Sequence, residues 1–422
     1  MTLGTGDPAR REESLFAPVR KSIAKGEWKF VTLLPSTVTE ELAQELSSIV
    51  RGVDVRVHPL PMGAEDDADK AYSHFDERLV EILGVTRPEN VEIDFTRGTK
   101  AMSAALVLAA ARHEIPSLRY VTGERDSRGT VVPGTEQVRH VRTTTVEVHR
   151  RLDLSRDLMC RGNFTACAEV LDGLPSSGDL PKQVSIFREI QAAARYYAAW
   201  DRLDYSSAAQ IELGSQPSER WAALWPTERS REWVATLACM PDRSNHKEMA
   251  EWLRCLLVDL LANGERRVQQ GDYEDALVRA YRVLELVGQA RLFDHGLDSG
   301  NLDSDHESVK RLREELRQKG EHPLKEGQDG QIQAARLQSA RLLRQCNDPI
   351  AERLMQFEKE TLLKPSLRNT SVLVHGFTSR APADESQLCG LFESLERLIE
   401  ADGGGSVRSK LAVARLLSFH DC

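Results

Sequence analysis

A strand, a turn and a helix follow one another without interruption between Val91 and His113. Val91, Ile93 and Phe95 alternate with polar residues, which is typical of a β-strand. After a turn with one glycine, apolar residues return at helical spacing, namely Met102, Ala105, Leu106, Ala109 and Ala110. A unit of this kind is the building block of α/β proteins, so this part of the chain is expected to form a mostly parallel sheet covered by helices.

The turn Thr96–Lys100 has the composition of an anion-binding site. The N-terminus of a helix presents unpaired backbone N–H groups, and its dipole favours negative charge there. Thr96, Thr99 and Ser103 add hydroxyl donors, and Lys100 adds a cation. The inferred ligand is therefore phosphorylated. From the spacing alone a purely structural corner is an equally good interpretation, because every doubly wound sheet needs such turns.

The string Asp94-x-Thr96-x-Gly98-Thr99-Lys100-x-Met102-Ser103 resembles the ligand-binding motif of CARF domains, the CRISPR-associated Rossmann folds. That family senses cyclic oligoadenylates made by type III CRISPR complexes. The resemblance implies a cyclic oligoadenylate as allosteric activator, with no other cofactor. It also implies that Arg97, Gly98 and Met102 contact the ligand together with the residues of the turn. Arg97 stands where most members have a second glycine, which could alter these contacts.

A second half of the pocket is expected from an earlier loop. Trp28–Leu34 is an apolar run rich in strand formers, and Thr39–Val50 has a helical pattern, so the two predict a first β-loop-α unit. The resemblance places this loop beside the motif turn, which makes Pro35, Ser36 and Thr37 the second set of contacts. A simple turn is the alternative. Residues 1–20 are charged and lack periodicity, and are expected to form a loose arm.

Further strands are predicted at Val53–Leu60, Leu118–Val121 and Val138–Val148, with a helix at Asp69–Leu83 and a hairpin at Glu124–Gly134. The glycine signature of dinucleotide folds does not follow the first predicted strand, which argues against a nicotinamide dehydrogenase. With 422 residues the chain is expected to form two or three domains. The α/β domain is assigned to residues 21–151.

From residue 152 onward the pattern is helical throughout. Residues 152–245 are interpreted as a connector and residues 246–422 as a second, all-helical domain, with strong helices at Met249–Asn263 and Asp272–Leu292. On the latter helix, Arg282, Glu285 and Gln289 form a polar stripe. A solvated face or an internal ion pair explains the stripe, which also resembles part of the opening helix of HEPN domains attached to CARF domains. Residues 293–335 are expected to be a partly mobile insertion.

Arg368, Asn369 and His375 form the catalytic candidate. Arg368 and His375 are seven residues apart, which is two helical turns, so they project from nearly the same face. A histidine that merely favours the helix dipole is the alternative. The pattern Arg-Asn-x-x-x-x-x-His resembles the HEPN ribonuclease motif. This resemblance implies metal-independent cleavage of single-stranded RNA, and, with one motif per chain, a homodimer that joins two motifs.

The composition of the chain excludes several classes of function. A net charge of −9 argues against a protein that coats nucleic acid, and no helix-turn-helix with a basic recognition helix is found, so specific DNA binding is not expected. No apolar run is long enough to span a membrane, and a cytoplasmic protein with reduced cysteines is expected. Two other functions stay open: a non-catalytic regulator that binds cyclic oligoadenylate, and a ring nuclease that degrades its activator in the CARF pocket.

Overall fold

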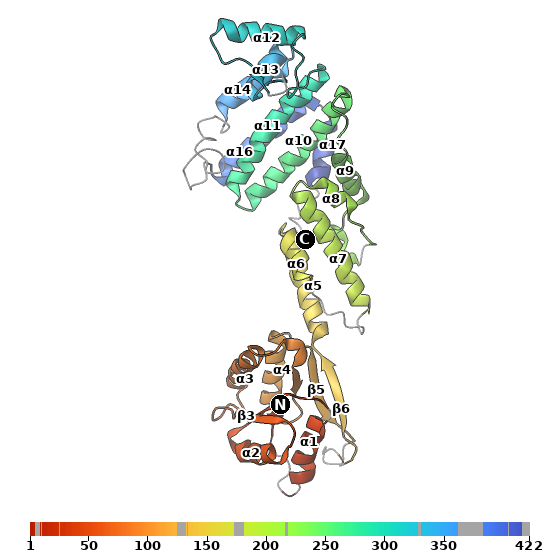
Figure 1. Cartoon of the computed structure of the whole chain (residues 1–422), viewed down its shortest axis with the longest axis vertical. Helices are drawn as coiled ribbons and strands as arrows, with labels where there is room; N and C mark the ends of the chain where they lie inside the picture. The colour runs from red at the N-terminus through yellow and green to blue at the C-terminus, as the bar shows by residue number, and fades with distance from the viewer. Residues whose placement is uncertain are drawn as a thin grey trace. The chain divides into compact units, whose positions relative to one another are not determined.

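The computed structural model describes residues 1–4, 9, 11–24, 26–124, 132, 134–172, 181–215, 218–327, 331–361, 383–403 and 405–415. The chain divides into two compact units, Met1–Leu152 and Asp153–Cys422. As Figure 1 shows, strands and helices alternate in the first unit, whereas the second is built from helices and one small hairpin. The expected class, an α/β part followed by an all-helical part, is confirmed.

Two three-stranded sheets form the centre of the first unit. Their strands are β1 (Thr2–Leu3), β2 (Phe30–Pro35), β3 (Asp54–Val57), β4 (Glu92–Asp94), β5 (Ser117–Thr122) and β6 (Gln137–Arg142). Paired strands are parallel except β5 and β6, which run antiparallel. The sheets adjoin at β1 and β4, because a Cβ on Gly98 would lie 3.1 Å from the Cβ of Thr2. The succession β3-β2-β1-β4-β5-β6 is that of a doubly wound nucleotide-binding fold.

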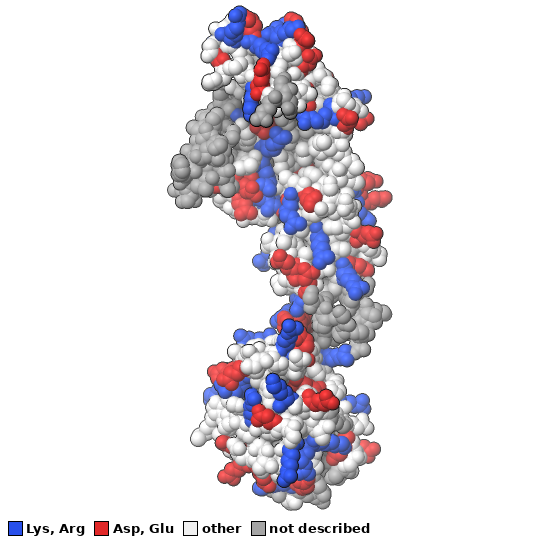
Figure 2. All heavy atoms as spheres, in the orientation of Figure 1, with Lys and Arg blue, Asp and Glu red and all other residues white. Residues whose placement is uncertain are grey.

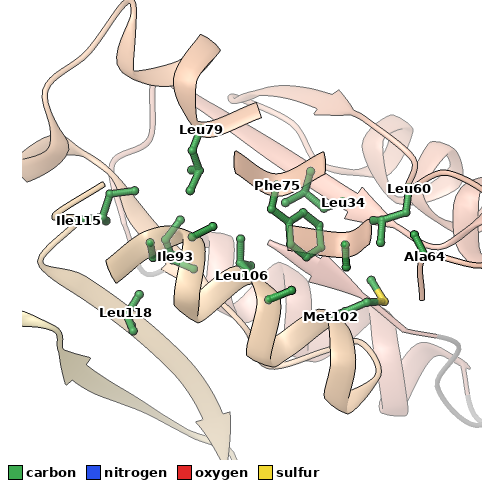
Figure 3. Close-up of a cluster of buried hydrophobic side chains, with 14 residues drawn as sticks. Leu34, Leu60, Ala64, Phe75, Leu79, Ile93, Met102, Leu106, Ile115 and Leu118 are labelled. Carbon is green, nitrogen blue, oxygen red and sulfur yellow. The ribbon is translucent and has the colours of Figure 1, made fainter. Parts of the chain in front are cut away.

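Helices cover both faces of these sheets. On β2, Leu33 and Leu34 point to opposite faces, as neighbours on a strand must. Leu33 belongs to a core with side chains of α1 (Ala17–Ala24) and α2 (Glu40–Ile49). Leu34 belongs to another core, which Figure 3 shows, with side chains of α3 (Ala68–Leu83) and α4 (Lys100–Arg112). The apolar residues of α4 that define its helical spacing are all buried, as predicted.

The expectation of a loose arm over residues 1–20 is wrong for the part that the structure describes. Thr2 and Leu3 are fully buried, and Leu15 is buried in the same core as Leu33. Thr2 pairs with Leu34 and Leu3 with Pro35 in the β1–β2 ladder. The first β-α unit therefore begins at the start of the chain, and the unit predicted as first, which includes β2 and α2, is the second.

The last strand predicted for this unit, Val138–Val148, is a strand only as far as Arg142. β6 ends at Arg142, and α5 (Thr144–Cys160) begins two residues later. Thr143 marks the change, because its hydroxyl donates to the Ile115 carbonyl at 2.7 Å and its backbone carbonyl accepts from Val146 and Glu147. Val146 and Val148 therefore belong to a helix. Alternation of apolar and polar residues over 138–148 did not reveal this boundary.

The second unit begins with a set of helices that lies within the predicted connector. These are α6 (Phe164–Val170), α7 (Pro181–Asp201), α8 (Tyr205–Gln210) and α9 (Glu228–Ala238). Side chains cap two of them: Asp204 accepts from the Ser207 amide and Thr227 from the Ser230 amide, both at 3.1 Å. These caps satisfy amides that the first turn of a helix leaves unpaired. They explain why α8 and α9 begin where they do.

The rest of the unit is organised on a long helix pair, α10 (His246–Gln269) and α11 (Tyr273–Asp294). The other elements are α12 (Glu307–Gln318), β7 (Lys325–Glu326), β8 (Ile332–Gln333), α13 (Arg336–Gln345), α14 (Ile350–Glu360), α16 (Glu385–Gly403) and α17 (Gly405–Ala414). The expected mobile insertion at 293–335 contains α12 and the β7–β8 hairpin. Val309, Leu312 and Leu316 bury one face of α12, which explains why this highly charged segment is folded.

Asp348 joins the end of α11 to the start of α14. Its side chain is fully buried and accepts from the Ile350 amide at 2.9 Å. Arg291, in the last turn of α11, and His295, directly after that helix, reach the other carboxylate oxygen, each at 2.7 Å. Burial acts to raise the pKa of Asp348, but the Ile350 amide, His295 and Arg291 outweigh it and hold that pKa below its ordinary value.

This depressed pKa predicts a pH dependence of stability. A carboxyl whose pKa is lower in the folded than in the unfolded chain stabilises the fold above the unfolded value, and loses that contribution as pH falls through the folded value. Between about pH 5 and pH 3, the free energy of unfolding should therefore fall less steeply in Asp348→Asn than in the wild type. Denaturant unfolding at each pH measures this.

The exposed carboxyl of Asp305 offers the control variant Asp305→Asn, which should keep the wild-type slope of the free energy of unfolding against pH. Equal slopes in all three proteins would contradict the prediction.

Candidate functional site

The motif turn lies where two strands of the first unit end side by side. β4 ends at Asp94 and α4 begins at Lys100. Gly98 has φ +133°, a backbone conformation that only glycine adopts without strain. A Cβ on Gly4, directly after β1, would lie 3.0 Å from the amide nitrogen of Gly98. The carboxyl ends of β1 and β4 thus meet at the point where strand order reverses, which is where open α/β sheets bind their ligands.

The hydroxyl groups predicted to contact a ligand donate to groups of the protein itself. Thr96 donates to the Asp94 carboxylate and accepts from the Val121 amide at 2.8 Å. Thr99 caps α4 by accepting from the Met102 amide at 3.1 Å, and its hydroxyl donates to the Glu65 carbonyl. Ser103 donates to the Phe95 carbonyl at 3.3 Å. These side chains hold the shape of the turn, a function that composition alone did not indicate.

The groups left to meet an anion are a lysine and the backbone at the start of α4. Lys100 is exposed and makes no ion pair with any residue that the structure describes. The amides of Lys100 and Ala101 are in the first turn of a helix, where no intrahelical acceptor exists. A negative group at this point would meet a cation, two amides and the positive end of the helix dipole. This arrangement can hold a phosphate.

Arg97 and Met102 are placed differently from the other residues of the motif. Met102 is only 1% exposed and packs in the core that Figure 3 shows. Arg97 is half-buried and lines a small internal space with Ser22 and Asp94. Burial lowers the pKa of Arg97, and the charges of Asp94 and Glu136 act against that shift. Met102 therefore packs the helix onto the sheet, and its direct contact with a ligand stays a prediction, as does that of Arg97.

The other predicted loop, which follows β2, adjoins the end of β1. Pro35 and Ser36 are buried, whereas Thr37 is exposed. The Ser36 hydroxyl lies 3.1 Å from that of Thr39, which donates to the Leu3 carbonyl at 3.0 Å. The loop thus supports the segment that leads into Gly4. Of the three residues expected to contact the ligand, Thr37 is the one whose side chain is on the surface.

A buried polar network around Asp94 supports the motif turn. Asp94 is 2% exposed and accepts from the Ser22 hydroxyl of α1 and from the backbone amide of Thr96. Arg119 of β5, also buried, lies between Asp94 at 3.4 Å and Glu92 at 3.2 Å. The two carboxylates balance the guanidinium charge, as burial of an ion requires. Ser22 and Arg119 had no recognisable signal in the sequence, because each is joined to Asp94 only by the fold.

The catalytic candidates Arg368, Asn369 and His375 lie outside the described residues, between α14 and α16. The polar stripe on α11 is described: Arg282 pairs with Glu285 at 2.9 Å and donates to Gln289 at 3.2 Å. The stripe is thus an ion pair on a partly exposed helix face, and its resemblance to the opening helix of HEPN domains stays a prediction. Among the described residues there is no group of three metal-ligating side chains.

Surface charge adds a limit on how nucleic acid could be bound. Figure 2 shows Lys and Arg interspersed with Asp and Glu on the face in view, over both units. Such a surface does not attract RNA along its whole length, since phosphate binding depends on clustered cations. An RNA site would therefore be local. None of the described helices combines the length and the apolar character needed to cross a lipid bilayer.

Comparison with known proteins gives a family match for part of the second unit and a fold match for the whole chain. Residues 245–401 match the family model of the Csm6 HEPN domain. A solved structure of Enterococcus italicus Csm6, bound to cyclic hexa-2′-fluoro-hexa-dAMP, has a similar fold with a TM-score of 0.58 and 11% sequence identity. That similarity covers 99% of this chain and 98% of the other. No curated protein shows a significant match to the sequence.

The fold and the matched region agree with each other. The second unit contains a region that matches the HEPN domain family of Csm6, and the first unit has the strand succession of a Rossmann-like domain. Both comparisons are with Csm6: residues 245–401 match its HEPN domain, and the fold of the chain is similar to that of the Enterococcus italicus Csm6. The predicted resemblance to a CARF–HEPN protein is thus confirmed in the HEPN region by the family match and in the fold by the solved structure.

Proposed function

We propose that this protein is an endoribonuclease that cleaves single-stranded RNA when a cyclic oligoadenylate binds its CARF domain, in the cytoplasmic antiviral defence of type III CRISPR systems. One observation supports this most strongly: the region 245–401, matched as a Csm6 HEPN domain, contains Arg368, Asn369 and His375 in the order of a ribonuclease motif. The same chain has, after β4, a turn and a helix N-terminus that can hold a phosphate. Sensor and effector are thus parts of one molecule.

The activator would bind at the ends of β1 and β4. Its phosphates would meet Lys100 and the first amides of α4, while Thr96, Thr99 and Ser103 hold the turn in place. The Enterococcus italicus Csm6 with bound cyclic hexa-2′-fluoro-hexa-dAMP supports this choice of ligand. Coupling requires that the activator bind one arrangement of the protein more tightly than another, since differential affinity is the only source of a population shift.

The cleavage chemistry follows from the three residues of the HEPN motif. A ribose 2′-oxygen forms a bond to the adjacent phosphorus while the bond from phosphorus to the 5′-oxygen breaks. Histidine changes protonation near neutral pH, so His375 would accept the 2′-OH proton or donate one to the leaving oxygen. Arg368 stays protonated and would stabilise the charge that develops on the phosphate, and Asn369 would orient the phosphate or the histidine. The products are a 2′,3′-cyclic phosphate and a 5′-hydroxyl, and no metal is needed.

One assay tests this function: purified protein, a labelled single-stranded RNA, and each cyclic oligoadenylate in turn, with and without excess EDTA. We expect one ring size to stimulate cleavage that EDTA does not stop. Loss of the activator without cleavage of other RNA would instead identify a ring nuclease. Binding with neither reaction would identify a non-catalytic regulator.

The oligomeric state gives a separate prediction. A single Arg368–His375 pair per chain is a sparse site, and two pairs joined across a twofold axis would supply twice the acid–base and cationic groups. We therefore expect light scattering at micromolar concentration to report a homodimer, with or without activator. A stable monomer that cleaves RNA at the activated rate would remove this argument.

A further inference from the structure

A buried carboxylate on the first HEPN helix is held by side chains of the connector. Asp259 of α10 has no solvent exposure. Its oxygen Oδ1 accepts from the indole nitrogens of Trp200 and Trp233, both at 2.9 Å, and Oδ2 accepts from the Tyr205 hydroxyl at 2.8 Å. These donors come from α7, α9 and the first residue of α8. Three separate connector helices thus converge on one residue of α10.

A second contact lies one turn further along the same face of α10. Asn263 and Arg266 both donate to Asp201, the last residue of α7, at 3.1 Å and 3.0 Å between the side-chain atoms. Arg279 of α11 donates in turn to Asn263. The polar contacts therefore run from the connector through α10 to α11, the two helices on which the HEPN domain is organised.

The complete burial of Asp259 makes this contact costly to break. Burial raises the pKa of Asp259 above its ordinary value, although the charge of Arg266 and the three aromatic donors act against that shift. A carboxyl group in an apolar interior is tolerated only while hydrogen bonds replace those that it would make with water. If α7, α8 or α9 moved away from α10, the carboxylate would lose donors that nothing else in the described surroundings supplies. The connector and α10 are therefore expected to move together.

We propose that Asp259 is a positioning residue through which connector helices α7, α8 and α9 set the placement of α10, so that activator binding changes the HEPN domain by way of this contact. The inference rests on the proposed function. It assigns the connector to the same rigid body as the HEPN domain, in line with the single compact unit Asp153–Cys422. The hydrogen bonds to Asp259 then carry the signal, and their loss weakens activation without touching the activator pocket or the catalytic residues.

Two tyrosines of the connector provide a matched pair of variants. Both are buried and both donate one hydrogen bond from the phenol. The Tyr205 hydroxyl donates to Asp259, across the contact with α10, whereas the Tyr196 hydroxyl donates to the Ser230 carbonyl at 3.0 Å, between α7 and α9 of the connector. Tyr205→Phe and Tyr196→Phe thus remove the same atom from similar surroundings. Only the first weakens the connection to the HEPN domain.

The experiment measures the ratio of activator-stimulated to basal RNA cleavage in the full chain, at saturating activator and well below the melting temperature of each variant. We expect Tyr205→Phe to lose about ten-fold in this ratio, the change that follows when a buried polar group is left without one hydrogen-bond partner. Tyr196→Phe should keep the wild-type ratio, although both variants lose some thermal stability. Trp233→Phe, which removes another donor to Asp259, should behave like Tyr205→Phe.

A purely structural contact would give a different result. It would lower the melting temperature of both tyrosine variants and leave the activation ratio of the folded protein unchanged in each, and that outcome overturns the proposal. Binding of activator to all variants, measured by calorimetry, should stay close to wild type; a loss confined to Tyr205→Phe would also overturn it. A wild-type chain that no cyclic oligoadenylate stimulates would refute the proposed function itself, and this inference with it.

Discussion

His375→Ala and Arg368→Ala should each abolish activator-stimulated RNA cleavage while leaving activator binding nearly unchanged. General acid–base catalysis contributes about 10²–10⁴-fold to a reaction rate, so His375→Ala should lower the cleavage rate by about that factor if the histidine transfers a proton in the reaction. Arg368→Ala removes the cation that faces the developing charge, a loss of similar size. Rates at saturating activator, with calorimetry of activator binding, measure both effects. A loss of less than about ten-fold would be too small for either assigned role.

Controls for this experiment come from the substrate and from the same segment. Ser371→Ala changes a residue between the two candidates and should retain most of the activity. A substrate with a 2′-deoxy sugar at the scissile position should resist cleavage, because the attacking oxygen is missing. The 5′ fragments of ordinary RNA should end in a 2′,3′-cyclic phosphate. Inhibition by EDTA, or equal cleavage of the deoxy substrate, would refute the HEPN assignment of Arg368 and His375.

Lys100→Ala should weaken activator binding about ten-fold to one hundred-fold. A hydrogen bond to a charged group is worth about 1.5–3 kcal/mol, and Lys100 is the exposed cation at the start of α4. The helical unit should be unaffected, so its unfolding should not change. Calorimetry with the activating cyclic oligoadenylate measures the dissociation constant. The affinity of the variant should also depend less on salt concentration, since one cation fewer meets the phosphates.

The control for Lys100 is another exposed lysine of the same unit. Lys29 directly precedes β2 and so lies at the amino end of the strands, the opposite edge of the sheet from Lys100. Lys29→Ala makes the same change in net charge and should leave the affinity as it is. If both variants bind alike, the turn is only a structural corner and the phosphate site lies elsewhere.

The motif strand, its helix and the long helices of the second unit were predictable, because periodicity extends over many residues in each. The strand β1 was not. Two residues cannot show a period, and Thr2 and Leu3 form a strand because they pair with β2, while the turn at Gly98 packs against Thr2 on the other side. The loop after β2 is therefore the second β-α loop of the sheet and not the first, and Gly4 lies at the end of a strand that the sequence did not predict.

Residue types predicted the turn and the start of α4 better than they predicted the role of each side chain. Thr99 and Ser103 do lie at the start of α4, as a phosphate site requires, but their hydroxyls donate to the carbonyls of Glu65 and Phe95. A sequence shows which residues can donate a hydrogen bond, whereas the acceptor depends on segments brought together by the fold. Glu65 is thirty-four residues away from Thr99 along the chain, so no local pattern could have connected them.

The near contact of Gly4 with Gly98 determines which mutations the pocket tolerates. Substitution by alanine acts on this turn only through Lys100 and through Thr96, Thr99 and Ser103, whose hydroxyls hold its shape. Substitutions that add atoms are not tolerated. A methyl group on Gly98 would clash with Thr2 and Met102 and would require a strained φ, and a methyl group on Gly4 would contact the Gly98 amide too closely. Related sequences that keep this turn are therefore expected to retain small residues at these two positions.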